Sequence, residues 1–228
     1  MKKLISGLFF ATVVMPAFAA PVYKAPVKQG VGSWFDGVWY GGIRGELSFL
    51  NWKNEYSASD VDVDGQSDSF SFEPVFGGSL SVGHIFDENW RGEVEAGMIG
   101  RFADSGYGVD FTLTVPYVSV NAIYDITEPD FAGMYVGGGL GIALPKIDFD
   151  YDTIDIKERG VSPMFAFMIG YSYEMSDNVS LDFRYRLAAL FGPDGKESNV
   201  VGYADRFFEI DTGLILDNSI SLGLRYEF

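Results

Sequence analysis

The chain contains no cysteine and only one histidine, His84, among its 228 residues. The missing cysteines exclude a disulfide framework, and any catalytic triad or histidine-based metal site would have to use His84. Basic residues are also scarce, because 16 Lys and Arg stand against 32 Asp and Glu. This balance argues against nucleic acid as a partner, since phosphate groups are bound by Lys and Arg. Beyond the first twenty residues, no apolar run reaches the roughly 20 residues that a helical membrane span needs.

The N-terminus has the three parts of a secretory signal peptide. Lys2 and Lys3 form its positive region, residues 4–15 form a short, mostly apolar segment, and residues 17–19 (AFA) supply the small side chains that signal peptidase accepts. The sequence therefore predicts a signal peptide over residues 1–19 and export to the periplasm. Loss of the two lysines changes the formal net charge from −16 to −18. Residues 20–33 are predicted as a periplasmic N-terminal tail, and residues 34–228 as a single domain.

From Trp39 onward, apolar and polar residues alternate in eight segments. In the first segment Trp39, Ile43 and Leu47 share one phase, and Arg44 and Glu46 share the other. A period of two is typical of a strand with one apolar and one polar face. The prediction is an all-β fold, an eight-stranded antiparallel up-and-down transmembrane β-barrel whose apolar phase faces lipid. Such an exposed apolar phase argues against a soluble lipocalin-like binding protein.

The connections between the eight segments alternate between short and long. Short, turn-forming sequences lie at residues 87–89, 127–130 and 176–178, and longer ones at about residues 53–70, 103–110, 144–160 and 188–213. Short turns face the periplasm and long loops face outside in such barrels. Aromatic residues of the lipid phase gather at the short-turn end, as an interfacial girdle would: Trp39, Trp90, Tyr124, Tyr173 and Phe228. The start of the eighth strand stays open, because residues 207–216 fit either the strand or the fourth loop.

Three motifs carry a family resemblance. Residues 35–41 (FDGVWYG) with Gly45 resemble the opening strand of small eight-stranded outer-membrane β-barrel proteins, the "porin family" with OmpA- and OmpX-like barrels, and residues 135–141 (YVGGGLG) resemble their fifth strand. Residues 222–228 (LGLRYEF) are similar to the C-terminal signature that these proteins present to the barrel-assembly machinery, so the resemblance marks Tyr226 and Phe228 as an assembly signal. The resemblance spans the mature chain outside the long loops. It implies location in the outer membrane of a Gram-negative bacterium, and no particular activity.

The polar phase of the predicted strands carries a balanced set of charges. Five arginines and five acids fall on it: Arg44, Arg91, Arg184, Arg186, Arg225, Glu46, Glu93, Glu95, Asp182 and Glu227. Eight strands enclose a space that side chains nearly fill, and unpaired charges there would be costly. The favoured interpretation is a network of salt bridges that plugs the lumen. The alternative is a charged constriction that passes ions or small solutes.

The first long loop is acidic at a spacing that resembles the start of a calcium loop. Asp60, Asp62 and Asp64 precede a glycine, and Asp68 follows. The twelfth position, where a calcium loop has Glu, is Ser71. The third long loop is acidic too, with Asp148, Asp150, Asp152 and Asp155. One hypothesis is weak binding of divalent cations at the lipopolysaccharide surface, and the simpler one is solvated loops that prevent association. No metal site is firmly predicted, and no cofactor.

Nothing in the sequence points to catalysis. His84 falls on the lipid phase beside a periplasmic turn, which favours a structural role, and no G-x-S-x-G, H-E-x-x-H or P-loop pattern occurs. The sequence predicts a non-enzymatic barrel with a structural or surface-interaction role. Its predicted surroundings are outer-membrane lipid and lipopolysaccharide, and its loop partner is unidentified. A small-solute porin or ion channel stays as the alternative function.

Overall fold

The computed structural model describes residues 37–58, 67–71, 74–106, 109–151, 154–191, 194–198 and 207–228. Eight long strands form the wall of a barrel: β1 (Val38–Ala58), β3 (Val75–Ile85), β4 (Trp90–Gly106), β5 (Val109–Asp125), β6 (Met134–Ala143), β9 (Ser162–Ser176), β10 (Val179–Phe191) and β12 (Phe207–Glu227). Four short strands extend it: β2 (Ser67–Ser71), β7 (Lys146–Tyr151), β8 (Ile154–Arg159) and β11 (Asp194–Ser198). A single-turn 3₁₀ helix, η1 (Pro129–Phe131), lies between β5 and β6.

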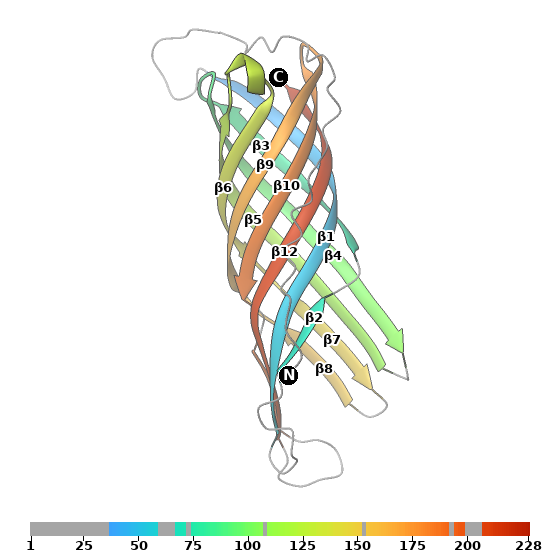
Figure 1. The fold of residues 1–228 in the computed structure, drawn as a ribbon. Coiled ribbons are helices and arrows are strands. Elements are labelled where there is room, and N and C mark those ends of the chain that lie inside the picture. Colours follow the sequence, from blue (N-terminus) through green and yellow to red (C-terminus); the bar gives the residue numbers. More distant parts are fainter. Residues whose placement is uncertain are drawn as a thin grey trace.

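The wall closes because the first and last strands pair with each other (Figure 1). β1 and β12 are antiparallel, and their register runs from Tyr40 opposite Glu227 to Ala58 opposite Phe208. The other wall strands pair in chain order, each antiparallel to the next. Closure leaves no unpaired edge in the wall, which is the condition for a sheet to span a bilayer. The predicted fold, a closed eight-stranded antiparallel barrel, is confirmed.

The alternation of the sequence separates the two faces of this wall. Outward side chains are large, apolar and exposed, such as Ile43 (59% exposed), Leu140 (63%) and Phe165 (54%). Inward positions are buried and largely polar, so the sheet has the reverse polarity of a soluble protein. Among the described residues, no helix has both the length and the apolar character that a bilayer crossing needs.

One end of the barrel, the turn end, carries the short connections. Asp87 Oδ1 accepts hydrogen bonds of 2.8 Å from the backbone N–H groups of Asn89 and Trp90, which fixes the turn between β3 and β4. Outward aromatic residues lie at the same end, with the Trp90 and Tyr124 rings 5.1 Å apart, centroid to centroid. Trp39, Trp90 and Tyr173 are 42%, 48% and 39% exposed. This matches the predicted interfacial girdle.

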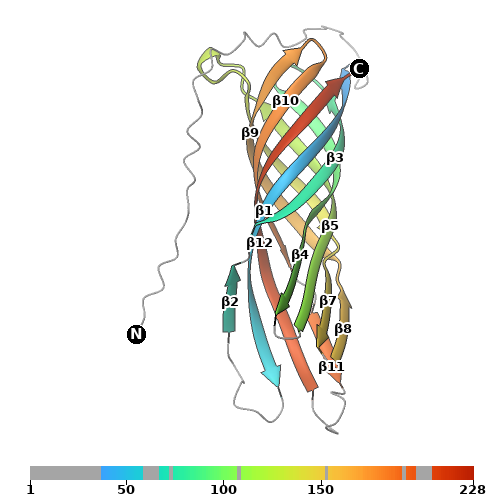
Figure 2. The same cartoon turned by 90° about the vertical axis from the view of Figure 1, so that its right-hand side faces the viewer.

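The opposite end, the hairpin end, is more regular than expected from the sequence. Segments predicted as wide loops are largely strand, because β1, β4, β5 and β12 continue past the wall. The extension of β4 pairs with that of β5, and β1, β5 and β12 pair with the short strands β2, β7 and β11. β12 begins at Phe207, which settles the start of the eighth strand. Beyond the wall the strands form two hydrogen-bonded groups, β2–β1–β12–β11 and β4–β5–β7–β8, whose long strands diverge in Figure 1. The outermost strands of the two groups, β11 and β8, lie close to each other, as Figure 2 shows.

Prolines mark the level at which the wall ends. Pro74 directly precedes β3, Pro145 lies in the gap between β6 and β7, and Pro163 is the second residue of β9. Proline has no N–H to donate to a ladder, so it is confined to strand starts, edges and irregularities. The wall is therefore continuous up to these residues, and four of its eight strands are interrupted beyond them.

Candidate functional site

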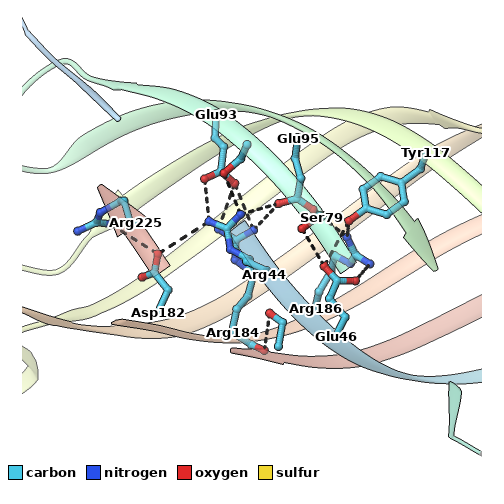
Figure 3. A network of polar contacts seen from close by, with 12 residues as sticks. Arg44, Glu46, Ser79, Glu93, Glu95, Tyr117, Asp182, Arg184, Arg186 and Arg225 are labelled. Carbon is cyan, nitrogen blue, oxygen red and sulfur yellow. Dashed lines mark hydrogen bonds and ion pairs between the residues drawn. The ribbon is translucent and has the colours of Figure 1, made fainter. Parts of the chain in front are cut away.

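The barrel interior contains the densest set of polar side chains in the described part of the chain. Nine of the ten charged residues predicted for the lumen are buried there, and Glu227 is half-buried at the turn end. Their strands bring them together because every second residue of β1, β4, β10 and β12 points inward. Figure 3 shows arginines and acids from these four strands meeting in the middle of the barrel.

Two arginines hold the centre of this ionic network. Arg44 Nη2 lies 2.8 Å from Glu93 Oε2, and Arg44 Nη1 lies 3.1 Å from Glu95 Oε2. Arg184 contacts the same two acids, at 3.2 Å from Glu93 Oε1 and 2.8 Å from Glu95 Oε2. All four side chains are at most 2% exposed. Each carboxylate is therefore shared by at least two guanidinium groups, which offsets its loss of hydration.

A second group lies on the side of the hairpin end. Arg186 reaches three acids, at 2.8 Å from Glu46 Oε2, 3.1 Å from Glu95 Oε1 and 3.4 Å from Asp217 Oδ2. Arg186 also donates to the hydroxyl of Tyr117, whose oxygen lies 2.5 Å from Glu95 Oε1. These contacts link β1, β4, β5, β10 and β12, so five wall strands are tied together across the lumen.

A third group lies near the turn end and is built around Arg91. Its Nε atom lies 3.0 Å from Asp125 Oδ2. Among the described residues its Nη atoms have no hydrogen-bond acceptor. The guanidinium instead lies over the ring of Tyr135, 4.7 Å from the centroid, with the Tyr40 ring at 5.9 Å. Cation–π contact with two ring faces stabilises a buried guanidinium.

Asp182 and Arg225 complete the turn-end group. Asp182 Oδ2 lies 3.8 Å from Arg44 Nη2 and 3.9 Å from Arg225 Nη1, and Asp182 also accepts a hydrogen bond from Ser172. Arg225 Nε lies 3.4 Å from Glu227 Oε1. Asp182 therefore connects this group to the centre of the ionic network.

The interior also contains two acids and three tyrosines that were not among the predicted lumen residues. Asp217 was not among the predicted lumen residues, although the inward phase of β12 continues through Ser221, Ser219 and Asp217. Asp125 was not predicted either, although it follows Asn121 and Ile123 on the inward phase of β5. Both lie in phase with buried neighbours, so an extended count of alternate positions would have found them.

Each of the three inward tyrosines lies against a glycine of the neighbouring strand. The paired positions are Tyr40 with Gly83, Tyr117 with Gly97 and Tyr135 with Gly170. A Cβ atom on any of these glycines would collide with the tyrosine side chain. The missing side chains let the rings lie over the adjacent backbone and turn a face toward arginine, as for Arg186 over Tyr117 at 4.6 Å.

An apolar layer lies on the hairpin side of the ionic network. We call it the collar, and it comprises Leu50, Val75, Ile99, Val115, Tyr117, Ala143, Met164, Ala188, Leu190 and Ile215. The ring of Tyr117 belongs to the collar, whereas its hydroxyl reaches the ionic network. These residues form one cluster, with at least one member from each wall strand, and none is more than 6% exposed. The sequence analysis assigned a polar character to the whole inward phase and did not anticipate this layer.

His84 occupies a different place from the other predicted residues. It pairs with Trp39 on the outward phase, as predicted, but it is only 6% exposed because aromatic rings cover it. The Trp39 and Phe86 ring centroids lie 4.8 and 5.0 Å from the imidazole. Within the described ranges, no group of three or more His, Cys, Asp or Glu side chains is arranged to hold a metal ion.

The predicted cation loop falls mainly outside the structure's description. Asp60, Asp62, Asp64 and Asp152 lie outside the described residues. Asp68 belongs to β2 and pairs with Asn54, while Asp148, Asp150 and Asp155 belong to β7 and β8. The cation hypothesis therefore stays a prediction. Tyr226 and Phe228, the predicted assembly signal, are exposed at the turn end (56% and 71%).

Comparisons with known proteins decide the family. A family model described as "Outer membrane protein beta-barrel domain" matches residues 10–228. The chain belongs to this family. A comparison with curated protein sequences gave no match. Membership in the outer membrane protein beta-barrel domain family places the chain in the bacterial outer membrane and agrees with the closed barrel and its apolar outer face.

Solved structures of other outer-membrane proteins share the fold. Neisserial surface protein A (NspA) is 19% identical, with a TM-score of 0.51 over 83% of this chain and 97% of NspA. Ail, the attachment invasion locus protein of Yersinia pestis, in complex with the heparin analogue sucrose octasulfate, is 15% identical, with a TM-score of 0.52 over 84% of this chain and 99% of Ail. At these identities the likeness concerns the fold alone.

Proposed function

We propose that this protein is a closed outer-membrane barrel that holds its extended strands at the cell surface for interaction with other molecules. The observation that carries the proposal is the buried ionic network. Arg44, Arg184 and Arg186 are at most 4% exposed, and each forms ion pairs with acids of the same barrel. A conducting pore needs charged groups that face water, whereas these groups face one another.

A small-solute porin is the competing function. It would use the same charges as a filter, so ions would have to displace contacts as short as 2.8 Å. Opening such a path costs the energy of several charge-assisted hydrogen bonds at once. The proposal also assigns no catalytic role, because the only histidine is enclosed by the rings of Trp39 and Phe86.

The charge of the hairpin end indicates which partners would fit the surface role. Residues 51–74, 100–114, 144–162 and 192–213 contain 7 Lys or Arg against 18 Asp or Glu. Ail was solved with a sulfated polyanion, and the acidic hairpin end of the present chain would repel such a ligand. The fitting partners are cationic: basic protein surfaces, or divalent cations among lipopolysaccharide phosphates.

The proposal includes the route to this location. Residues 1–19 would direct export and be removed, residues 20–33 would remain as a periplasmic tail, and the assembly machinery would recognise Tyr226 and Phe228. The turn end would then face the periplasm and the acidic hairpin end the outside.

Planar-bilayer recording tests the closed barrel. The refolded protein, checked by its heat-dependent migration in gels, is expected to give no stable current steps. Steps proportional to salt concentration, which change when Arg44 or Glu93 is neutralised, would establish a channel through the ionic network and contradict the proposal. Heat-denatured protein that has not been refolded serves as the negative control.

Calcium titration tests the surface chemistry separately. Isothermal titration of the folded barrel with calcium is expected to release heat with weak affinity, and the triple variant Asp60→Asn, Asp62→Asn, Asp64→Asn is expected to lose it. A matched variant of the third acidic segment, Asp148→Asn with Asp150→Asn, locates the effect. No heat from the unaltered protein would contradict divalent-cation binding and leave basic protein surfaces as the partner.

A further inference from the structure

We infer that the collar, and not the ionic network, is the barrier that keeps water and ions out of the barrel from the hairpin end. This inference rests on the proposed function, because it says which layer keeps the barrel closed. It assigns different roles to two layers that both lie in the lumen.

The collar completely encircles the lumen. Its members come from β1, β3, β4, β5, β6, β9, β10 and β12, so the apolar layer has no gap in any strand of the wall. Leu50, Ile99, Leu190 and Ile215 are each at most 2% exposed. They belong to one packed cluster, which means that side chains from different strands meet in the lumen and do not merely line it.

The order along each strand places the collar on the outer side of the charges. On β1, Arg44 and Glu46 come first and Leu50 follows toward the hairpin end. On β10, Arg184 and Arg186 precede Leu190 in the same direction. The collar also lies at the proline level, since Val75 follows Pro74 and Ala143 precedes Pro145 by two residues. It is therefore the last complete layer before the wall separates into two groups of strands.

The physical reason concerns what each layer offers to a hydrated ion. When a contact in a network of guanidinium and carboxylate groups opens, the freed groups can hydrogen-bond to water and pair with ions. An apolar constriction offers no hydrogen bonds and excludes ions by dewetting. Opening or neutralising a pair in the ionic network would thus leave the path closed, as long as the collar stays packed.

The absence of cysteine makes the barrier measurable by thiol chemistry. Ser48 is fully buried, lies two residues before Leu50, and faces Ser219 across the β1–β12 pair. Ser48→Cys adds a single thiol on the network side of the collar. A small cationic methanethiosulfonate reagent, applied to the protein in micelles, then reports access to that layer. Ser176→Cys, at the exposed turn between β9 and β10, is the fully accessible control.

Two variants are compared in the Ser48→Cys background. The collar variant carries Ile99→Ser, Leu190→Ser and Ile215→Ser, and the network variant carries Glu46→Gln with Arg186→Gln. Since access requires local opening, we expect Ser48→Cys alone to react about a hundredfold more slowly than Ser176→Cys. The collar variant is expected to react about tenfold faster than Ser48→Cys alone, and the network variant to stay slow. Heat-dependent gel migration establishes that each variant is folded, and Leu190→Ser alone replaces the triple variant if that fails to fold.

The other outcomes overturn the inference in distinguishable ways. A fast network variant with a slow collar variant would move the barrier to the charges and leave the closed barrel intact. Two slow variants would place the barrier elsewhere in the lumen. Fast reaction of Ser48→Cys itself would remove the collar as a barrier, and the bilayer recording of the unaltered protein would then decide whether the proposed function also fails.

Discussion

Replacing Arg44 by methionine tests whether the ionic network is a water-free part of the fold. The guanidinium contacts Glu93 at 2.8 Å, Glu95 at 3.1 Å, Asp182 at 3.8 Å and Ser81 Oγ at 3.1 Å. Methionine preserves much of the stem but removes the charge. Glu93 and Glu95 would keep Arg184, whereas Arg225, at 3.9 Å, would be the one ion-pair partner left to Asp182 beside its hydrogen bond from Ser172.

The expected cost follows from leaving buried acids undercompensated. Removal of one partner of a buried ion pair typically costs about 3–5 kcal/mol, because the remaining charge cannot be hydrated. We therefore expect Arg44→Met to lower the free energy of unfolding by about 3–5 kcal/mol. The double variant Arg44→Met with Glu93→Gln removes both members of a pair. Its loss of unfolding free energy should therefore be smaller than the sum of the two single losses by more than about 1 kcal/mol.

Reversible urea unfolding in lipid vesicles, followed by tryptophan fluorescence and by gel migration, measures these free energies. Arg159→Met is the matched control, because Arg159 is exposed at the end of β8 and its loss should cost within about 0.5 kcal/mol. A cost below about 1 kcal/mol for Arg44→Met would mean that water replaces the arginine. That result would refute the water-free interior, and with it the argument for a closed barrel.

Three further results are expected, each checked on the folded protein or on its assembly. Gly170→Ala should lower the urea midpoint by an amount equivalent to about 1–3 kcal/mol, because its Cβ would collide with Tyr135. Gly45→Ala, with open space around it, should leave the midpoint unchanged, and equal midpoints for the two variants would contradict the tyrosine–glycine packing. Val120→Arg, on the outer face at mid-wall, should cost about 2–4 kcal/mol in vesicles and Met175→Arg, at the turn end, about 0–1 kcal/mol; the reverse order would misplace the bilayer. Phe228→Ala should reduce the amount of folded barrel in cells, measured by membrane fractionation, but leave refolding into vesicles, measured by gel migration, unchanged. An equal loss in both settings would give Phe228 a structural role instead.

The sequence was sufficient for the fold because one rule governs every strand. Lipid outside and a polar lumen inside impose a period of two, so residues such as Ile43 and Arg44 reveal their faces without any knowledge of their neighbours. Turn formers at Asp87 and Asn89 then gave the boundaries at the turn end.

The interior was less predictable because it depends on register between distant strands. The inward phase of Arg186 can be read from the sequence, but only the pairing of β10 with β12, and of β12 with β1, brings Arg186 to Asp217 and Glu46. The collar was missed for a related reason. Leu50 and Leu190 lie at inward positions where polar residues give way to apolar ones. That these positions lie at one level of the barrel becomes visible only when all eight strands are aligned.

The strand interruptions at Pro74, Pro145 and Pro163 divide the barrel into two parts that differ in how well they tolerate insertions and deletions. Below them, a one-residue insertion would reverse the faces of a strand and expose charges to lipid. Above them, β2 and β7 each pair with a continuing strand and β8 pairs with β7, so changes in length there need not shift the register of the wall. The barrel is thus suited to changes in the length and sequence of its hairpin end, such as the grafting of foreign epitopes by protein engineers.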